Sequence, residues 1–66
     1  MKVVHEYTGD VVNPGDEVVD FRGEVVKFLG ISKIPDGVST GRVRVAGDGW
    51  EMSYYPSVFA LKIVEG

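Results

Sequence analysis

The sequence predicts a single all-β domain over residues 1–66, with five to six short antiparallel strands bent into a small open barrel. Short stretches of β-branched and aromatic residues alternate with Gly, Pro, Asn or Asp, which is the pattern of strands joined by turns. No long stretch has helical periodicity, because Gly or Pro interrupts each candidate window. Strands so few and so short cannot build two full sheets, but they can curve around one core.

The N-terminal half is expected to hold three strands, at Lys2–Tyr7, Glu17–Phe21 and Glu24–Ile31. A long loop, Thr8–Asp16, separates the first two strands. Its end, Asn13–Asp16, predicts a turn, because Pro presets φ at the first central position and Gly accepts a positive φ at the next.

The strand Glu24–Ile31 carries apolar residues on both faces and is therefore expected to cross the core. Gly30 is the natural place for a bend or a bulge in it. Three phenylalanines are expected in the core, Phe21, Phe28 and Phe59.

The C-terminal half predicts a surface loop followed by a hairpin. The strand Gly41–Ala46 alternates, with valines facing inward and arginines facing outward. A short connection, Gly47–Gly49, leads into the partner strand Trp50–Tyr54. A single 3₁₀ turn at Pro56–Val58 is expected before the last strand, Ala60–Val64.

Composition limits the function classes. The formal net charge is −3, which disfavours binding to a nucleic-acid backbone. No apolar run approaches the ~20 residues of a membrane span, and the first residues lack the apolar core of a signal peptide. Cysteine is absent, which fits a reducing compartment. We therefore expect a cytoplasmic protein without a membrane segment.

Catalytic and metal-binding residues are not evident. The only histidine, His5, has no second histidine to complete a transition-metal site and is expected to be half-exposed on a strand. Acidic residues surround the first loop, but the spacing of a calcium-binding loop is missing. We expect neither enzymatic activity nor a cofactor or metal.

Aromatic residues are the main candidates for a binding surface. The expected protein-binding residues are Tyr7, Trp50, Tyr54, Tyr55 and Pro56. Trp50 shares a strand face with Met52 and Tyr54, so it could either fill the core or stand on the surface.

Arg42 and Arg44 share the outward face of one strand and could bind an anion or a nucleotide phosphate. The alternative is a solvated face in which they pair with Glu51 across the hairpin. Arg22 could pair in the same way with Asp20 or Glu24.

The order of elements from Gly41 to Val64 resembles the second half of an SH3-like barrel, and Tyr55–Phe59 looks like the Pro-Ser-Asn-Tyr turn of that fold. The chain departs from peptide-binding SH3 domains at Val4–Tyr7, where their opening signature would stand, and Trp50 follows the hairpin instead of preceding it. The resemblance implies the barrel architecture and does not carry over polyproline binding.

A second resemblance is to small uncharacterised proteins encoded by phages of actinobacteria. It rests on Asp20–Glu24, Gly41–Val45, Gly49-Trp50 and Tyr55–Phe59. It implies a phage origin and a role inside the host cell.

Three functions remain open at this point. The first is a small non-catalytic binding module that docks on a host or phage protein through its aromatic surface. The second is a protein that binds or sequesters a small ligand or nucleotide through Arg42 and Arg44, and the third is a nucleic-acid-binding barrel. Self-association is a further possibility, because exposed edge strands invite pairing.

Overall fold

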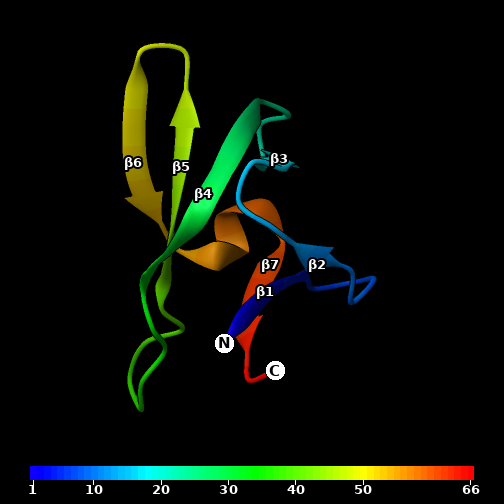
Figure 1. Ribbon diagram of the computed structural model, residues 1–66, viewed down its shortest axis with the longest axis vertical. Coiled ribbons are helices and arrows are strands. Elements are labelled where there is room, and N and C mark those ends of the chain that lie inside the picture. Colours follow the sequence, from blue (N-terminus) through cyan, green and yellow to red (C-terminus); the bar gives the residue numbers. More distant parts are fainter.

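The computed structural model describes residues 1–66, and half of them lie in strands. Seven strands and one 3₁₀ turn, η1, follow one another along the chain (Figure 1). They are β1 (Lys2–His5), β2 (Val11–Val12), β3 (Glu17–Val19), β4 (Val25–Lys33), β5 (Arg42–Gly47), β6 (Trp50–Tyr54), η1 (Pro56–Phe59) and β7 (Leu61–Val64). The all-β prediction and the turn before the last strand are confirmed. The chain contains no helix with the length and apolar character needed to cross a membrane.

Two antiparallel sheets make up the fold. One has the order β2-β1-β7, so it joins the first and last strands of the chain. The other has the order β3-β4-β5-β6, and its β5–β6 hairpin extends beyond the other elements (Figure 1). This arrangement is consistent with a small barrel or sandwich, and the SH3-like architecture stays a prediction.

The turn at Asn13–Asp16 forms as expected. The Asp16 N–H donates to the Asn13 carbonyl at 3.0 Å, and Gly15 has a φ of 97°. The Asp16 carboxylate accepts a hydrogen bond from the Asn13 N–H at 2.8 Å and closes the turn from the other side. Such side-chain bonds to nearby backbone groups stabilise turns without a regular ladder.

The long strand β4 bends where the sequence predicted. Its pairing with β5 shifts between Phe28 and Gly30 and again between Ile31 and Lys33. Before the first shift the strand alternates strictly, with Val26 and Phe28 buried. The bulges re-aim the second half of β4, so that Ile31 also packs against the core.

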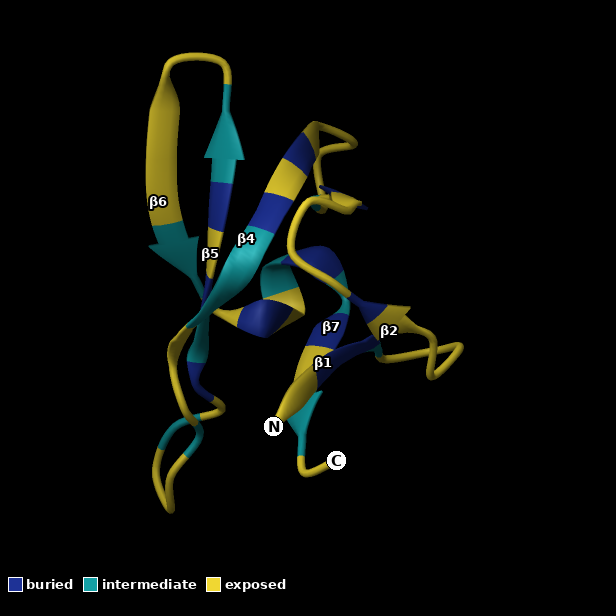
Figure 2. Cartoon of the chain, in the orientation of Figure 1, coloured by how far each residue is buried: buried dark blue, intermediate teal, exposed yellow.

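Both sheets and η1 contribute to a single core. Val43 and Val45 on β5 are fully buried, which confirms their inward orientation. The core residues are Val3, Val12, Val18, Val26, Phe28, Val43, Val45, Phe59 and Leu61. Figure 2 shows the buried positions alternating with exposed ones along β4 and β5. This alternation leaves the outer sheet surface polar and directs the apolar face inward.

Two expectations were wrong. Phe21 is not in the core: β3 ends at Val19, and Phe21 lies in the turn that follows, with 80% of its surface exposed. The stretch Thr8–Asp16 is not entirely loop either, because Val11 and Val12 pair with β1 as the short strand β2. Val12 fills a place in the core, and this burial explains why so short a strand forms.

Candidate binding site

An apolar pocket of about 280 Å³ lies between β6 and the turn Asp20–Gly23 that follows β3. Side chains from four separate parts of the chain converge on it. Its lining residues are Asp20, Phe21, Arg22, Val26, Trp50, Tyr54, Val58 and Phe59. Val26 and Phe59 belong to the buried core, so the pocket is an opening through which the core meets the surface. Apolar surface left open in this way is typical of a binding site.

The β5–β6 hairpin supplies one wall of the pocket. Gly47 and Trp50 are paired across a two-residue turn. The indole of Trp50 lies directly over Gly47, where any side chain would overlap the ring. Trp50 remains 39% exposed, so it covers the hairpin on one side and faces the pocket on the other. Of the two alternatives for Trp50, the core and the surface, the structure shows an exposed position with the indole lying against the hairpin.

Tyr54 connects this wall to the core. Its ring meets the ring of Phe59 edge to face, with centroids 5.8 Å apart and an interplanar angle of 80°. This geometry is the favoured one for aromatic pairs. The Tyr54 hydroxyl lies 3.5 Å from the sulfur of Met52 on the same strand. The ring of Tyr54 therefore contacts the core through Phe59, and its hydroxyl contacts β6.

The opposite wall is a turn held by its own side chains. The Asp20 carboxylate accepts hydrogen bonds from the backbone N–H of Arg22 at 2.8 Å and of Glu24 at 3.0 Å. The Arg22 guanidinium pairs with Asp20 at 3.2 Å and with Glu24 at 3.4 Å. These contacts fix the turn that presents Phe21, and the guanidinium lies 5.7 Å from the Phe21 ring centroid.

The turn also changes the proton affinity of its charged groups. Burial of the Asp20 side chain, which is 6% exposed, acts to raise the pKa of its carboxyl. Hydrogen bonds from the Glu24 and Arg22 backbone and from the Arg22 guanidinium outweigh this effect, and the pKa is lowered overall. The hydrogen bond to Asp20 in turn raises the pKa of Arg22. Asp20 therefore remains ionised while it holds the turn.

One of the strands that line the pocket has an unpaired edge. β6 is the last strand of its sheet and pairs only with β5 (Figure 1). In an antiparallel ladder, successive residues direct their backbone groups alternately toward the partner strand and away from it. Because Gly47 and Trp50 flank a tight turn and pair with each other, the groups of Glu51 and Ser53 face away from β5.

The structure brings together only part of the predicted aromatic set. Trp50 and Tyr54 line the pocket. Tyr7 lies outside it, 85% exposed in the loop after β1, and Pro56 is buried at the start of η1. Tyr55 contacts Arg42 instead of the pocket.

Phe21 is the pocket residue that the sequence analysis assigned to the core. The signal for its exposure was Asp20-Phe21-Arg22-Gly23, with Asp in the first and Gly in the fourth position of a β-turn.

No family model matches the chain, and neither a curated protein nor a solved structure matches it.

The two arginines of β5, Arg42 and Arg44, have different partners. Arg44 pairs with Glu51 across the hairpin at 3.2 Å, as one of the two readings predicted. Arg42 pairs with no carboxylate: its guanidinium stacks on Tyr55 and donates to the Tyr55 hydroxyl at 3.3 Å. The two arginines thus share a strand but differ in their partners.

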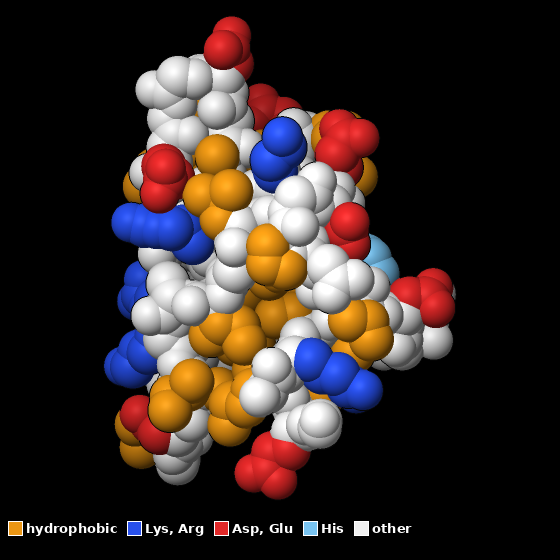
Figure 3. All heavy atoms as spheres, viewed as in Figure 1, with side chains coloured by type: hydrophobic (Ala, Val, Ile, Leu, Met, Phe, Trp, Pro, Cys, Tyr) orange, Lys and Arg blue, Asp and Glu red, His pale blue; other side chains and the backbone are white.

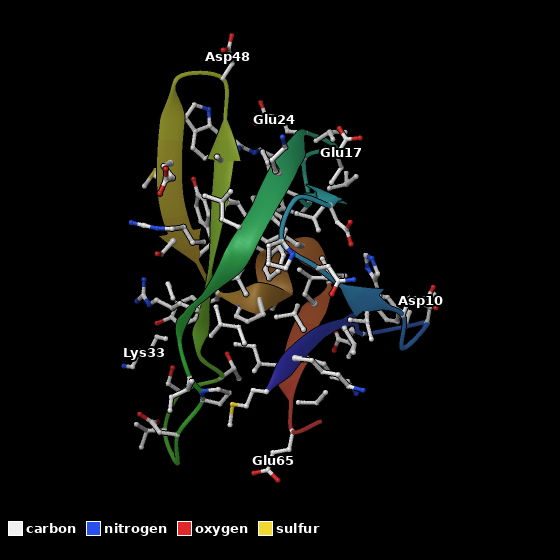
Figure 4. All side chains as sticks on the ribbon, in the orientation of Figure 1. Asp10, Glu17, Glu24, Lys33, Asp48 and Glu65 are labelled. Carbon is white, nitrogen blue, oxygen red and sulfur yellow. The ribbon has the colours of Figure 1, made fainter.

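His5 is half-buried on β1, as expected. No three His, Asp or Glu side chains come together in a group that could hold a metal ion. The labelled carboxylates point outward: Asp48 lies at the hairpin tip, Asp10 in the loop after β1, and Glu17 and Glu24 near the turn between β3 and β4 (Figure 4).

Proposed function

We propose that the chain is a non-catalytic binding module that accepts an extended apolar segment of another protein in the pocket between β6 and the Asp20–Gly23 turn. One observation carries the proposal: Phe21 is 80% exposed on a turn that other side chains hold in place, and it shares a pocket with Trp50 and Tyr54 of the edge strand β6. A ring that is already held in place loses less conformational entropy when a partner binds it.

An extended segment fits this site better than a helix does. The outward backbone groups of Glu51 and Ser53 can hydrogen-bond to an added strand, which continues the sheet beyond β6. The side chains of such a strand point alternately to its two faces, so every second one would enter the pocket beside Trp50 and Phe21. Backbone pairing would supply general affinity, and the pocket would select large apolar side chains.

Charge favours a different protein over a second copy of this chain. Each copy carries a formal net charge of −3, and two copies in contact repel each other. The carboxylates beside the pocket are already paired, Asp20 with Arg22 and Glu51 with Arg44, so recognition there rests on apolar side chains. In keeping with the resemblance to phage proteins, we propose a host or phage protein in the host cytoplasm as the partner.

The test begins with peptides selected from a random displayed library on the immobilised protein. The selected peptides are synthesised, and their dissociation constants are measured by calorimetry for the unmodified protein, Phe21→Ser and Tyr7→Ser. Both rings are almost fully exposed, so either change should alter the free energy of unfolding by less than about 0.5 kcal/mol. We expect Phe21→Ser to weaken binding at least about tenfold and Tyr7→Ser to leave it unchanged.

Three results would contradict the proposal. The first is failure of the library to enrich any apolar peptide, and the second is equal loss of binding in both variants. The third is a dimer in light scattering that dissociates in Phe21→Ser, because a second copy would then occupy the pocket.

A further inference from the structure

A second hollow lies on the outer face of the β3-β4-β5-β6 sheet, on the side opposite to the core. Its volume is about 540 Å³, and it forms where β4 bulges twice against β5. Its lining residues are Leu29, Gly30, Ile31, Ser32, Lys33, Arg42, Arg44 and Ser53. We call this hollow the cationic groove. None of these residues lines the apolar pocket, and the inference drawn from the groove does not depend on the proposed function.

The cationic groove concentrates positive charge on an acidic protein. Three of the seven Lys and Arg residues line it, and no Asp or Glu does. In Figure 3, Lys and Arg side chains gather along one margin of the molecule beside β5 and β6, and Figure 4 shows Lys33 reaching out on that same side. This gathering opposes the net charge of −3 and is therefore local to this face.

Two of these cations lie opposite each other without a counterion. Lys33 on β4 pairs in register with Arg42 on β5. Side chains at such positions have Cβ atoms about 5 Å apart, and like charges there destabilise a sheet. Arg22 and Arg44 form the ion pairs of the structure, whereas Lys33 and Arg42 form none. The pKa of Asp36 is lowered chiefly by a hydrogen bond from the Val38 N–H and least by the charge of Lys33, with which it forms no ion pair.

Arg42 is held in position before any ligand arrives. Its guanidinium carbon lies 4.6 Å from the centroid of the Tyr55 ring, and its Nη2 donates to the Tyr55 hydroxyl at 3.3 Å. Stacking leaves the remaining N–H donors of the planar group free for an anion. Because the side chain is already ordered, less conformational entropy is lost when it binds.

We infer that the cationic groove binds a small phosphoryl-bearing molecule, with Lys33 and Arg42 as the charged ligands of the phosphoryl group. A tetrahedral oxyanion can accept two hydrogen bonds from the Arg42 guanidinium and form an ion pair with the Lys33 ammonium at the same time. The hydroxyls of Ser32 and Ser53 line the same hollow and can donate as well. A volume of 540 Å³ lies in the range of small-molecule sites and exceeds what inorganic phosphate alone needs.

A small ligand fits the charges better than a nucleic acid does. Arg44 pairs with Glu51, which leaves Lys33 and Arg42 as the two cations of the groove that form no ion pair. A polyanion gains affinity from many phosphate contacts, and the negative net charge would repel the rest of its backbone. A ligand with one to three phosphoryl groups makes few contacts, and the two cations present can supply them.

The test is a titration of the ¹⁵N-labelled protein with inorganic phosphate, pyrophosphate, ATP and a single-stranded oligonucleotide at constant ionic strength. We expect ATP or pyrophosphate to shift the amide signals of residues 29–33 and 42–44. Lys33→Ala and Arg42→Ala should each weaken binding at least about tenfold. Lys27→Ala is the matched control, since Lys27 is exposed on the same strand but does not line the groove, and it should leave binding unchanged.

The dispersion of the amide spectrum establishes that each variant is folded. Arg42→Lys keeps the charge and should retain part of the affinity. The inference is overturned if no phosphoryl compound shifts these signals, or if Lys27→Ala weakens binding as much as Lys33→Ala. Tighter binding of the oligonucleotide than of ATP would also overturn it, in favour of a nucleic-acid site.

Discussion

Asp20 is the residue on which the geometry of the apolar pocket depends. Its carboxylate accepts two backbone N–H bonds and pairs with Arg22, and these contacts hold the turn that exposes Phe21. A carboxylate with several donors is stabilised in its ionised form, which lowers its pKa. The Asp20 carboxylate therefore stabilises the turn as long as it stays ionised.

Protonation of Asp20 in acid should weaken the contacts that hold the turn. The pKa of Asp20 is lowered in the folded state from an ordinary value of 3.8. Its contribution to stability is therefore complete above about pH 4 and is lost as the pH falls through the lower, folded-state pKa. We predict that the free energy of unfolding, measured with urea from pH 7 downward, falls more steeply below pH 4 in the unmodified protein than in Asp20→Asn. Asp48→Asn at the hairpin tip serves as the control and should follow the unmodified protein; an equally steep fall in Asp20→Asn would contradict this role.

Among the elements, the β5–β6 hairpin shows how much the sequence could predict. The alternation of Val43 and Val45 with two arginines correctly predicted which side of β5 faces the core. Gly30 correctly marked the bulge in β4, because glycine tolerates the distorted backbone there. Periodicity could not predict that β3 stops at Val19, since the hydrogen bonds of the Asp20 side chain end that strand.

Predicting the candidate sites from the sequence requires knowing which residues far apart in the chain meet in the fold. Trp50 and Tyr54 were predicted from their residue type and lie in the pocket, but Tyr7 and Tyr55 do not. Tyr55 follows Tyr54 in extended backbone, so the two side chains point to opposite sides. The distance of Tyr7 from the pocket depends on how the two sheets are placed. The pairing of Lys33 with Arg42 depends on the register of β4 after two bulges, which no sequence pattern specifies.

The hairpin also yields a prediction of its own. The Trp50 indole lies against Gly47, so Gly47→Ala should displace the ring from the hairpin. We expect a shift of tryptophan fluorescence to longer wavelength, a loss of about 1 kcal/mol in stability, and weaker binding of the selected peptides. Gly37→Ala, in a loop with open space around the added methyl group, should change none of these. An unchanged emission spectrum in Gly47→Ala would show that the indole does not depend on this contact.

At the scale of the whole molecule, the two sheets share one core and leave two different surfaces. The apolar pocket opens at the edge of β6, whereas the cationic groove lies on the outer sheet face. Arg44, which lines the groove, pairs with Glu51 across the hairpin. The two proposed sites meet at Ser53, which lines the groove and directs its backbone groups away from β5, and we expect each site to be disabled by its own substitutions.

We have proposed that a partner segment adds a strand to β6. Amide hydrogen exchange of the ¹⁵N-labelled protein, measured with and without a selected peptide, tests this strand addition most directly. We expect the amides of Glu51 and Ser53 to exchange quickly in the free protein and to become protected in the complex. Protection confined to other strands, with these two amides still exchanging quickly, would contradict strand addition at this edge.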